Sequence, residues 1–244
     1  MPPDERNRIA MSMNVLLVRS GGVNLLLDTG AGNKEDARFR SQYGLEDSTL
    51  MDGLKVHGLS PSDIHVVVNT HLHFDHAGGN TLRGEDGRIS PTFPNARYLV
   101  QRREYEDALV AHERNRASYL PDNYQPLAAS GQLQLLSGEV EVAPGVRTYP
   151  LPGHTLGLQG LFLDSRGQRA LCLTDCIPTG HHVPLPWIMA YDLHPMTTLE
   201  TKKRILPEAV REGWTVFFEH DPQVKAARIE ESKPGQFFAV PVEA

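Results

Sequence analysis

The chain has 244 residues, of which 40% are hydrophobic, and a formal net charge of -6 at pH 7. This length suits one large domain with a buried core, since no linker or low-complexity stretch divides it. The acidic balance and the lack of a basic run argue against a nucleic-acid substrate, because phosphate binding draws on clustered Lys and Arg.

The cysteine content and the hydropathy of the chain indicate its surroundings. Its two Cys, Cys172 and Cys176, give no disulfide framework, and we expect both to be reduced packing residues. We find neither a signal segment nor an apolar run of about eighteen residues in the sequence. The sequence therefore predicts a soluble, cytoplasmic protein that inserts into no membrane.

The first elements in chain order are β-rich. The runs 14–19 and 23–27 are separated by Ser20-Gly21-Gly22, which has the turn chemistry of a hairpin. Asp28 follows the second run, before Thr29-Gly30, and the simplest interpretation is a carboxylate that caps this turn. Residues 60–63 indicate a short helical turn before a strand.

The middle of the chain alternates between strand and helix patterns. Residues 65–69 form an apolar strand candidate, and Asp75 opens a brief helix that Gly78-Gly79 limits. A longer helix is predicted over 101–116, with its charged residues facing water. Residues 118–131 are predicted to be an irregular connection, either a plain solvated loop or part of a pocket rim.

The last third of the chain favours a hairpin, a helix and a closing strand pair. The runs 161–163 and 170–174 form the hairpin, and apolar spacing predicts a helix over 197–211. Pro207 should kink or divide that helix, because proline removes one main-chain hydrogen bond and clashes with the preceding turn. The end, 228–242, should close a sheet edge.

One short segment carries the strongest chemical signal. Within six residues, directly after the apolar run 66–68, it places four metal-ligand side chains: His71, His73, Asp75 and His76. Imidazole and carboxylate together suit zinc and similar divalent ions. This spacing should arise by chance roughly once in a thousand such sequences. The alternative is a His-rich turn on the surface.

Three further candidate ligands share one position, each directly after an apolar, strand-like run: His154, Asp175 and His220. Groups at the same ends of several strands gather along one edge of an open sheet. Taken singly, His154 could be a capping or buried polar residue and Asp175 a turn former. Their shared position favours ligands. The seven donors are too many for one tetrahedral ion but fit two, which predicts a dinuclear centre.

The chain resembles the metallo-β-lactamase superfamily in motifs that run in order over nearly its whole length. These motifs are His-x-His-x-Asp-His at 71–76, Gly153-His154-Thr155, Thr174-Asp175, Glu219-His220-Asp221 and, upstream, Leu25–Gly30. The resemblance implies a protein of the mixed α/β class (α+β), with the four-layer αββα sandwich of that superfamily. It also implies a single domain over residues 1-244.

The resemblance also implies how the ligands are shared. The first ion would be held by His71, His73 and His154. The second would be held by Asp75, His76 and His220, and Asp175 would bridge the two. Asp28 would lie behind the ligands as the carboxylate that orients them, which is the alternative to its role in the turn. The cofactors implied are two divalent ions, zinc first, with manganese, cobalt or iron as alternatives.

Within the superfamily, residues 93–98 and His220-Asp221-Pro222 resemble the branch of N-acyl-homoserine lactonases and organophosphate hydrolases. We therefore expect a hydrolase that uses a metal-bridging hydroxide on a lactone or carboxylic ester, with Asp75 moving a proton to the leaving group. Alternatives are a phosphotriesterase, a thioester hydrolase similar to glyoxalase II, an iron-dependent oxidoreductase of the same fold, and a noncatalytic binding protein.

The substrate pocket is the least specific part of the sequence. Many homoserine lactonases place a Tyr shortly after the bridging Asp, whereas Cys176, Ile177 and Pro178 follow it here. The next segment offers substitutes for a small-molecule pocket: His181, His182, Trp187 and Tyr191. The alternatives are core packing for the two aromatic residues and a surface role for the two His.

Two expectations concern the whole molecule. Relatives suggest a homodimer. They also carry an additional segment before the first hairpin, whereas this chain starts almost at the hairpin. We expect this segment of the relatives to be missing, either by deletion or because the start codon is assigned too far downstream.

Overall fold

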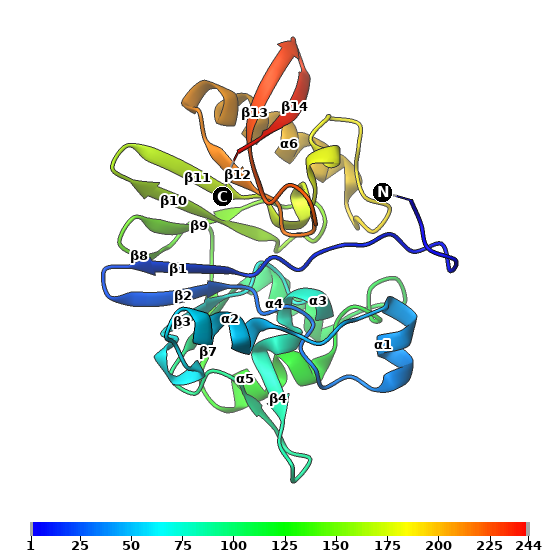
Figure 1. Cartoon of the computed structure of the whole chain (residues 1–244), viewed down its shortest axis with the longest axis vertical. Coiled ribbons are helices and arrows are strands. Elements are labelled where there is room, and N and C mark those ends of the chain that lie inside the picture. The colour runs from blue at the N-terminus through cyan, green and yellow to red at the C-terminus, as the bar shows by residue number, and fades with distance from the viewer. Residues whose placement is uncertain (1, 243–244) are drawn as a thin grey trace. The chain divides into compact units, whose positions relative to one another are not determined.

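A computed structural model describes residues 2–242, which fall into two units (Figure 1). The N-terminal unit is Val15–Val146, and the C-terminal unit is Arg147–Ala244 together with Met1–Asn14. Each unit contains a β-sheet and helices, which confirms the predicted mixed α/β class. The prediction of a single domain stays a prediction.

The sheet of the N-terminal unit has the strand order β1-β2-β3-β6-β7. Its strands are β1 (Leu16–Ser20), β2 (Val23–Leu27), β3 (Val66–Val68), β6 (Arg97–Gln101) and β7 (Leu133–Leu136). β1 and β2 form the predicted antiparallel hairpin, and the other neighbours pair in parallel. The three valines of β3 are all buried, as expected for a parallel strand covered on both faces.

Two apolar clusters hold four helices of this unit against its sheet. Leu54 of α2 and Leu127 of α5 belong to one cluster, and Ala77 of α3 and Ala108 of α4 belong to the other. The helices are α1 (Ala37–Tyr43), α2 (Leu50–Val56), α3 (Phe74–Ala77), α4 (Arg102–Leu109) and α5 (Gln125–Ala129). The remaining strands are β4 (Thr81–Arg83), β5 (Ile89–Pro91) and β8 (Glu141–Ala143).

The second sheet, most of which belongs to the C-terminal unit, runs in the order β14-β13-β12-β11-β10-β9-β8. Besides β8, its strands are β9 (Val146–Pro150), β10 (Gln159–Ser165), β11 (Gln168–Cys172), β12 (Thr215–Phe217), β13 (Ala226–Lys233) and β14 (Gln236–Pro241). β11 and β12 are parallel, whereas β10–β11, β12–β13 and β13–β14 are antiparallel. β14 lies at the edge, as the sequence predicts for the C-terminal strand pair.

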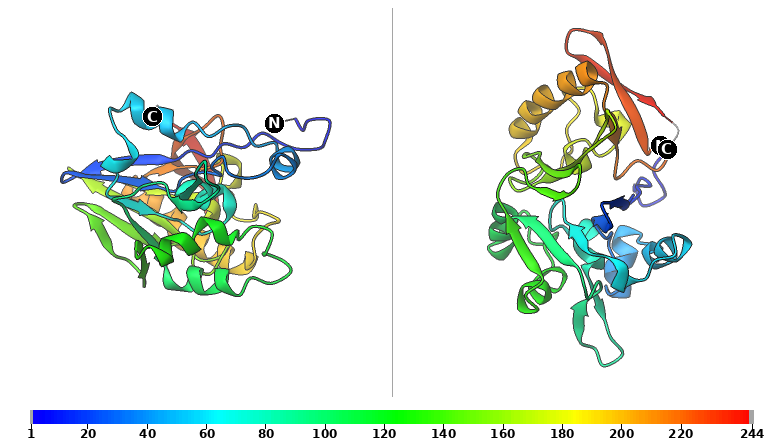
Figure 2. Two further views of the ribbon diagram at one scale, coloured as in Figure 1. Left: turned by 90° about the horizontal axis from the view of Figure 1, so that it is seen from below. Right: turned by 90° about the vertical axis from the view of Figure 1, so that its left-hand side faces the viewer.

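The long helix α6 (Pro195–Glu212) packs beside β13 in this unit (Figure 2). The helix continues through Pro207, so the prediction that this residue divides it is wrong, and the alternative of a kink stays a prediction. Ile205, Leu206 and Ala209 are buried in the core of the unit on both sides of the proline. This packing holds the helical path where one main-chain hydrogen bond is lost.

Two other predicted boundaries differ from the structure. The helix predicted over 101–116 ends at Leu109. The connection predicted to be irregular over 118–131 contains a 3-10 helix (Pro121–Asn123) and α5. The 3-10 helix and α5 each have a proline in the first turn, where the main-chain N–H that proline lacks would have no partner within the helix. Over residues 2–242, the structure contains no helix long and apolar enough to cross a membrane.

Candidate metal centre

In the N-terminal unit, the turn after β3 brings three imidazoles together. His71 and His76 are fully buried and His73 is 8% exposed. Nε2 of His71 lies 3.1 Å from Nδ1 of His73. The ring centroids of His71 and His76 are 4.0 Å apart. α3 starts directly after His73, so Asp75 and His76 project from its first turn, and Oδ2 of Asp75 lies 3.8 Å from Nε2 of His76.

Asp28 lies under this cluster and is also fully buried. It stands at the end of β2 with a φ of 58°, in the left-handed region that a residue with a Cβ rarely adopts. Its carboxylate accepts hydrogen bonds from N–H and Oγ1 of Thr70, at 2.8 and 2.6 Å, and lies 2.9 Å from Nδ1 of His76. A proton held on Nδ1 makes Nε2 of His76 the nitrogen whose lone pair can bind a metal ion.

A second buried carboxylate, that of Glu104, is linked to His73 through Tyr119. The ring of His73 packs against Tyr119 with centroids 4.7 Å apart, and the Tyr119 hydroxyl donates to Glu104 at 2.8 Å. Glu104 also accepts from the N–H of Leu72 at 3.0 Å. Burial, and then the Glu104 carboxylate, raise the pKa of Tyr119, so its hydroxyl stays a donor. The expectation that the charged residues of α4 face water is wrong for Glu104, which is fully buried.

In the C-terminal unit, one carboxylate lies between two imidazoles. Asp175 is in a 3-10 turn (Thr174–Cys176) after β11, His154 follows β9, and His220 follows β12. The Asp175 carboxylate lies 3.2 Å from Nε2 of His154 and 2.9 Å from Nε2 of His220. All three side chains are buried. The strand ends of this unit therefore gather their candidate ligands as the sequence predicts.

The other ring nitrogens of these imidazoles are also held. Nδ1 of His154 lies 3.1 Å from Asp192, and the same carboxylate accepts a hydrogen bond from the Thr198 hydroxyl. Nδ1 of His220 donates to the main-chain carbonyl of Ser12 at 2.7 Å. Such partners fix the tautomer that presents Nε2 to a metal ion. Sequence reasoning missed Asp192 and Ser12, because no local spacing links them to His residues 38 and 208 positions away.

The donor set fits divalent metal ions. Neutral imidazoles held at Nδ1, together with carboxylate oxygens, are the ligands that zinc and related ions take from proteins. All seven predicted ligands belong to groups of side chains that could hold a metal ion. Asp28 belongs to such a group too, although its carboxylate is already engaged by Thr70 and His76. The buried His and Asp clusters therefore have the chemistry of divalent-metal-binding sites.

The four predicted pocket residues lie on one loop of the C-terminal unit. Trp187 and Tyr191 are 62% and 64% exposed, which excludes the alternative of core packing for both. His181 is exposed, and His182 is half-buried with Nδ1 2.8 Å from the Thr179 hydroxyl. Burial, followed by the charge of Lys202, lowers the pKa of His182. His182 is therefore neutral near pH 7.

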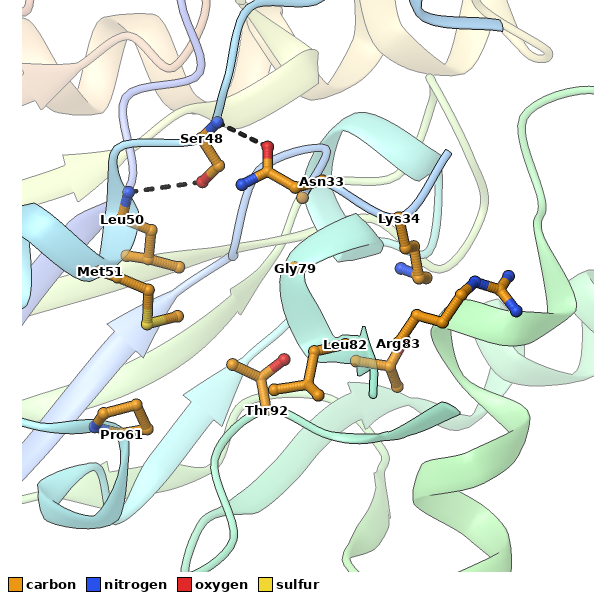
Figure 3. A pocket seen from close by; sticks show the side chains of 12 residues that line it. Asn33, Lys34, Ser48, Leu50, Met51, Pro61, Gly79, Leu82, Arg83 and Thr92 are labelled. Atoms are coloured by element: carbon orange, nitrogen blue, oxygen red, sulfur yellow. Dashed lines mark hydrogen bonds between the residues drawn. The ribbon is translucent and has the colours of Figure 1, made fainter. Parts of the chain in front are cut away.

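A cavity of about 250 Å³ lies in the N-terminal unit (Figure 3). Apolar side chains such as Met51 and Leu82 line it together with Lys34 and Thr92. Lys34 donates to the carbonyl of Gly78 at one side of this cavity. None of the predicted ligands or pocket residues lines it, so it is a feature separate from the candidate metal centre.

Comparison with known proteins identifies the family. Residues 10–220 match the metallo-beta-lactamase superfamily. An N-acyl homoserine lactonase from Bacillus thuringiensis is 33% identical over 189 residues, which cover 75% of this chain and 67% of the relative. The chain belongs to the metallo-β-lactamase superfamily.

Solved structures agree with this assignment. A probable metal-dependent hydrolase from Staphylococcus aureus matches 99% of this chain and 86% of its own, with a TM-score of 0.88 and 28% identity. An N-acyl homoserine lactone hydrolase, solved with N-hexanoyl-L-homoserine at its catalytic metal center, matches 87% of this chain and 82% of its own, with a TM-score of 0.68 and 28% identity. The predicted fold is thereby confirmed, and the protein is a metal-dependent hydrolase.

Proposed function

We propose that this enzyme hydrolyses lactones, with N-acyl homoserine lactones as the first substrate class to test. The observation that carries the proposal is the complete set of seven buried or half-buried His and Asp donors, in a chain similar to an N-acyl homoserine lactonase. A noncatalytic relative would be expected to have lost part of this set. An enzyme with a single iron would need fewer second-site ligands.

We propose that the donors are shared between two ions as the resemblance implies. His71, His73 and His154 would hold one ion, and Asp75, His76 and His220 the other, with Asp175 common to both. Zinc is the first choice, because His and Asp are its usual partners in hydrolases. Two such ions would supply Lewis acidity for the lactone carbonyl and lower the pKa of a water.

The residues of the chain have separate tasks in this proposal. Asp28 and Asp192 orient His76 and His154 through their Nδ1 atoms. Asp75 is the candidate for moving a proton to the leaving alkoxide when the ring opens, because its side chain is 31% exposed whereas His76 is fully buried. The loop with Trp187 and Tyr191 offers exposed aromatic surface for an apolar acyl group.

A second candidate function is hydrolysis of phosphotriesters or thioesters. The observation that favours it is the apolar stretch after Asp175, where Cys176 and Ile177 are buried. Burial raises the pKa of the Cys176 thiol to about 12, so this side chain does not act as a proton donor in place of a Tyr. A phosphotriester or thioester has no strict need of such a group.

A substrate panel on the metal-loaded protein tests the proposal. It should contain N-acyl homoserine lactones, simple lactones, aryl esters, phosphotriesters and glutathione thioesters, and Asp175→Ala serves as the inactive control. The highest kcat/KM on an acyl homoserine lactone supports the proposal. Activity confined to phosphotriesters or thioesters would favour the second candidate instead.

Two finer expectations also belong to the proposal. We propose a cytoplasmic enzyme, in keeping with the buried thiols of Cys172 and Cys176. We also propose a homodimer, by analogy with relatives. Sedimentation equilibrium of the purified protein measures the oligomeric state directly, and a monomer at all concentrations would contradict the homodimer.

A further inference from the structure

The side chain of Lys202 is buried in the C-terminal unit, where it projects from α6 toward the loop that follows Asp175. The residue is fully buried. Its ammonium donates to four main-chain carbonyls of that loop: His182 at 2.7 Å, Pro184 at 2.8 Å, Leu185 at 3.3 Å and Trp187 at 2.8 Å. One side chain therefore holds most of the segment 182–187.

A buried ammonium is costly unless polar groups surround it, which is why Lys is rarely buried. Burial lowers the pKa of Lys202 to about 8, so the charged form still prevails at neutral pH. The four carbonyl dipoles replace the water that the cation has lost. In return, the cation fixes the carbonyls of a loop whose other main-chain hydrogen bonds include one from the N–H of Trp187 to the carbonyl of Pro184 at 3.0 Å.

The ends of the same loop are tied to candidate metal ligands. At its start, N–H of His220 donates to the carbonyl of Pro178 at 3.0 Å. At its end, N–H of Leu193 donates to the carbonyl of His154 at 3.0 Å, and Asp192 holds the ring of His154. Lys202 holds the middle of the loop. A shift of the loop would therefore alter surfaces next to these ligands, all within the C-terminal unit.

The middle of the loop carries the side chains best suited to apolar substrate groups. Trp187 is 62% exposed, although its carbonyl is one of those bound by Lys202. Leu185 is half-buried and also has its carbonyl bound. Because the main chain of this segment is fixed, less conformational entropy is lost when these side chains bind an apolar substrate group.

We propose that Lys202 is a positioning residue that fixes the loop 182–187 and thereby determines how the enzyme binds the acyl chain of its substrate. This inference rests on the proposed lactone hydrolysis. Lys202 touches neither substrate nor metal in this scheme. Its loss should therefore weaken substrate binding and flatten the preference for acyl-chain length, while metal binding and the chemical step are retained.

The test compares Lys202→Met with Lys203→Met. Lys203 is the adjacent residue of α6, half exposed, and it pairs with Glu200 on the surface. Hydrogen exchange of peptides covering 180–191, metal content, and kcat and KM for short, medium and long acyl homoserine lactones are measured on the metal-loaded proteins. Pro184→Gly is a second variant that loosens the loop and keeps Lys202.

We expect Lys202→Met to raise exchange in 180–191 and to raise KM for its best substrate about tenfold, the effect of losing about 1.4 kcal/mol, with kcat within about twofold. Metal content should equal that of Lys203→Met. Exchange and KM equal to those of Lys203→Met would overturn the proposal. If Lys202→Met does not fold, Pro184→Gly decides: a raised KM supports the proposal, and an unchanged KM overturns it.

Failure of the proposed function gives a different result. A parent enzyme that hydrolyses no lactone would remove the lactonase proposal, and the same KM comparison would then be made with whichever ester, thioester or phosphotriester it accepts. Faster exchange with no change in KM for that substrate would show that Lys202 is only structural, which overturns the inference by itself.

Discussion

Replacement of Asp192 by Asn tests how the candidate ligands of the C-terminal unit are held. One oxygen of Asp192 faces Nδ1 of His154 at 3.1 Å, and the other accepts from Thr198. The side chain is 1% exposed, so water does not replace a lost partner. Asn keeps the size of the side chain but removes the charge that stabilises a proton on Nδ1.

The expected size of the effect follows from the type of hydrogen bond. A hydrogen bond to a charged group contributes about 1.5–3 kcal/mol, and 1.4 kcal/mol corresponds to a factor of ten. Asp192→Asn should therefore weaken binding of the zinc ion that His154 would hold about 10- to 150-fold. Competition with chelators of graded affinity measures this Kd.

A matched variant separates orientation from general damage to the loop. Thr198→Val removes the hydrogen bond to the second oxygen of Asp192 but keeps the charge beside His154. Thr198 acts on the zinc ion only through Asp192, so only part of the energy of this hydrogen bond reaches the metal, and the loss of zinc affinity should be about fivefold or less. Zinc binding by Asp192→Asn that is as tight as in the parent would refute the role given to Asp192.

Three further variants test other parts of the structure. Asp175→Ala should stay folded yet lose most activity together with metal; circular dichroism and elemental analysis check this, and full metal content with parent activity would contradict the assignment. In Gly153→Ala, the added Cβ would lie 2.2 Å from Oγ1 of Thr198, and φ at this position is 150°. We therefore expect the free energy of unfolding, measured in urea, to fall by about 1–3 kcal/mol, and an unchanged value would contradict this reasoning. Hydrogen bonds from the hydroxyl and N–H of Ser60 lower the pKa of Asp63 below its usual 3.8, so its stabilising contribution is complete above that value and is lost as pH falls further. The stability difference between the parent and Asp63→Asn should accordingly shrink as the pH falls below 3.8, and a difference that stays constant there would contradict the role of this cap.

The local parts of the structure were the predictable ones. The run from His71 to His76 and the strand that precedes it lie within a few residues, so spacing alone indicated their chemistry. The first hairpin and the one formed by β10 and β11 were predicted for the same reason, since turn residues and apolar runs are adjacent in the sequence.

The supporting residues could not be predicted, because they depend on long-range packing. Glu104 carries the pattern of an exposed helical residue, yet Tyr119 and the N–H of Leu72 hold it in the interior. Lys202 likewise lies on a helix rich in charged residues and is buried by carbonyls up to 20 positions away. Periodicity marks which helix face is apolar but does not reveal a polar group whose partners come from another element.

Calorimetric titration of the metal-free protein with zinc tests the central claim most directly. The seven donors predict that each chain binds two equivalents of zinc and that lactonase activity appears as the two sites fill. One equivalent, or none, would contradict the dinuclear centre and the function built on it.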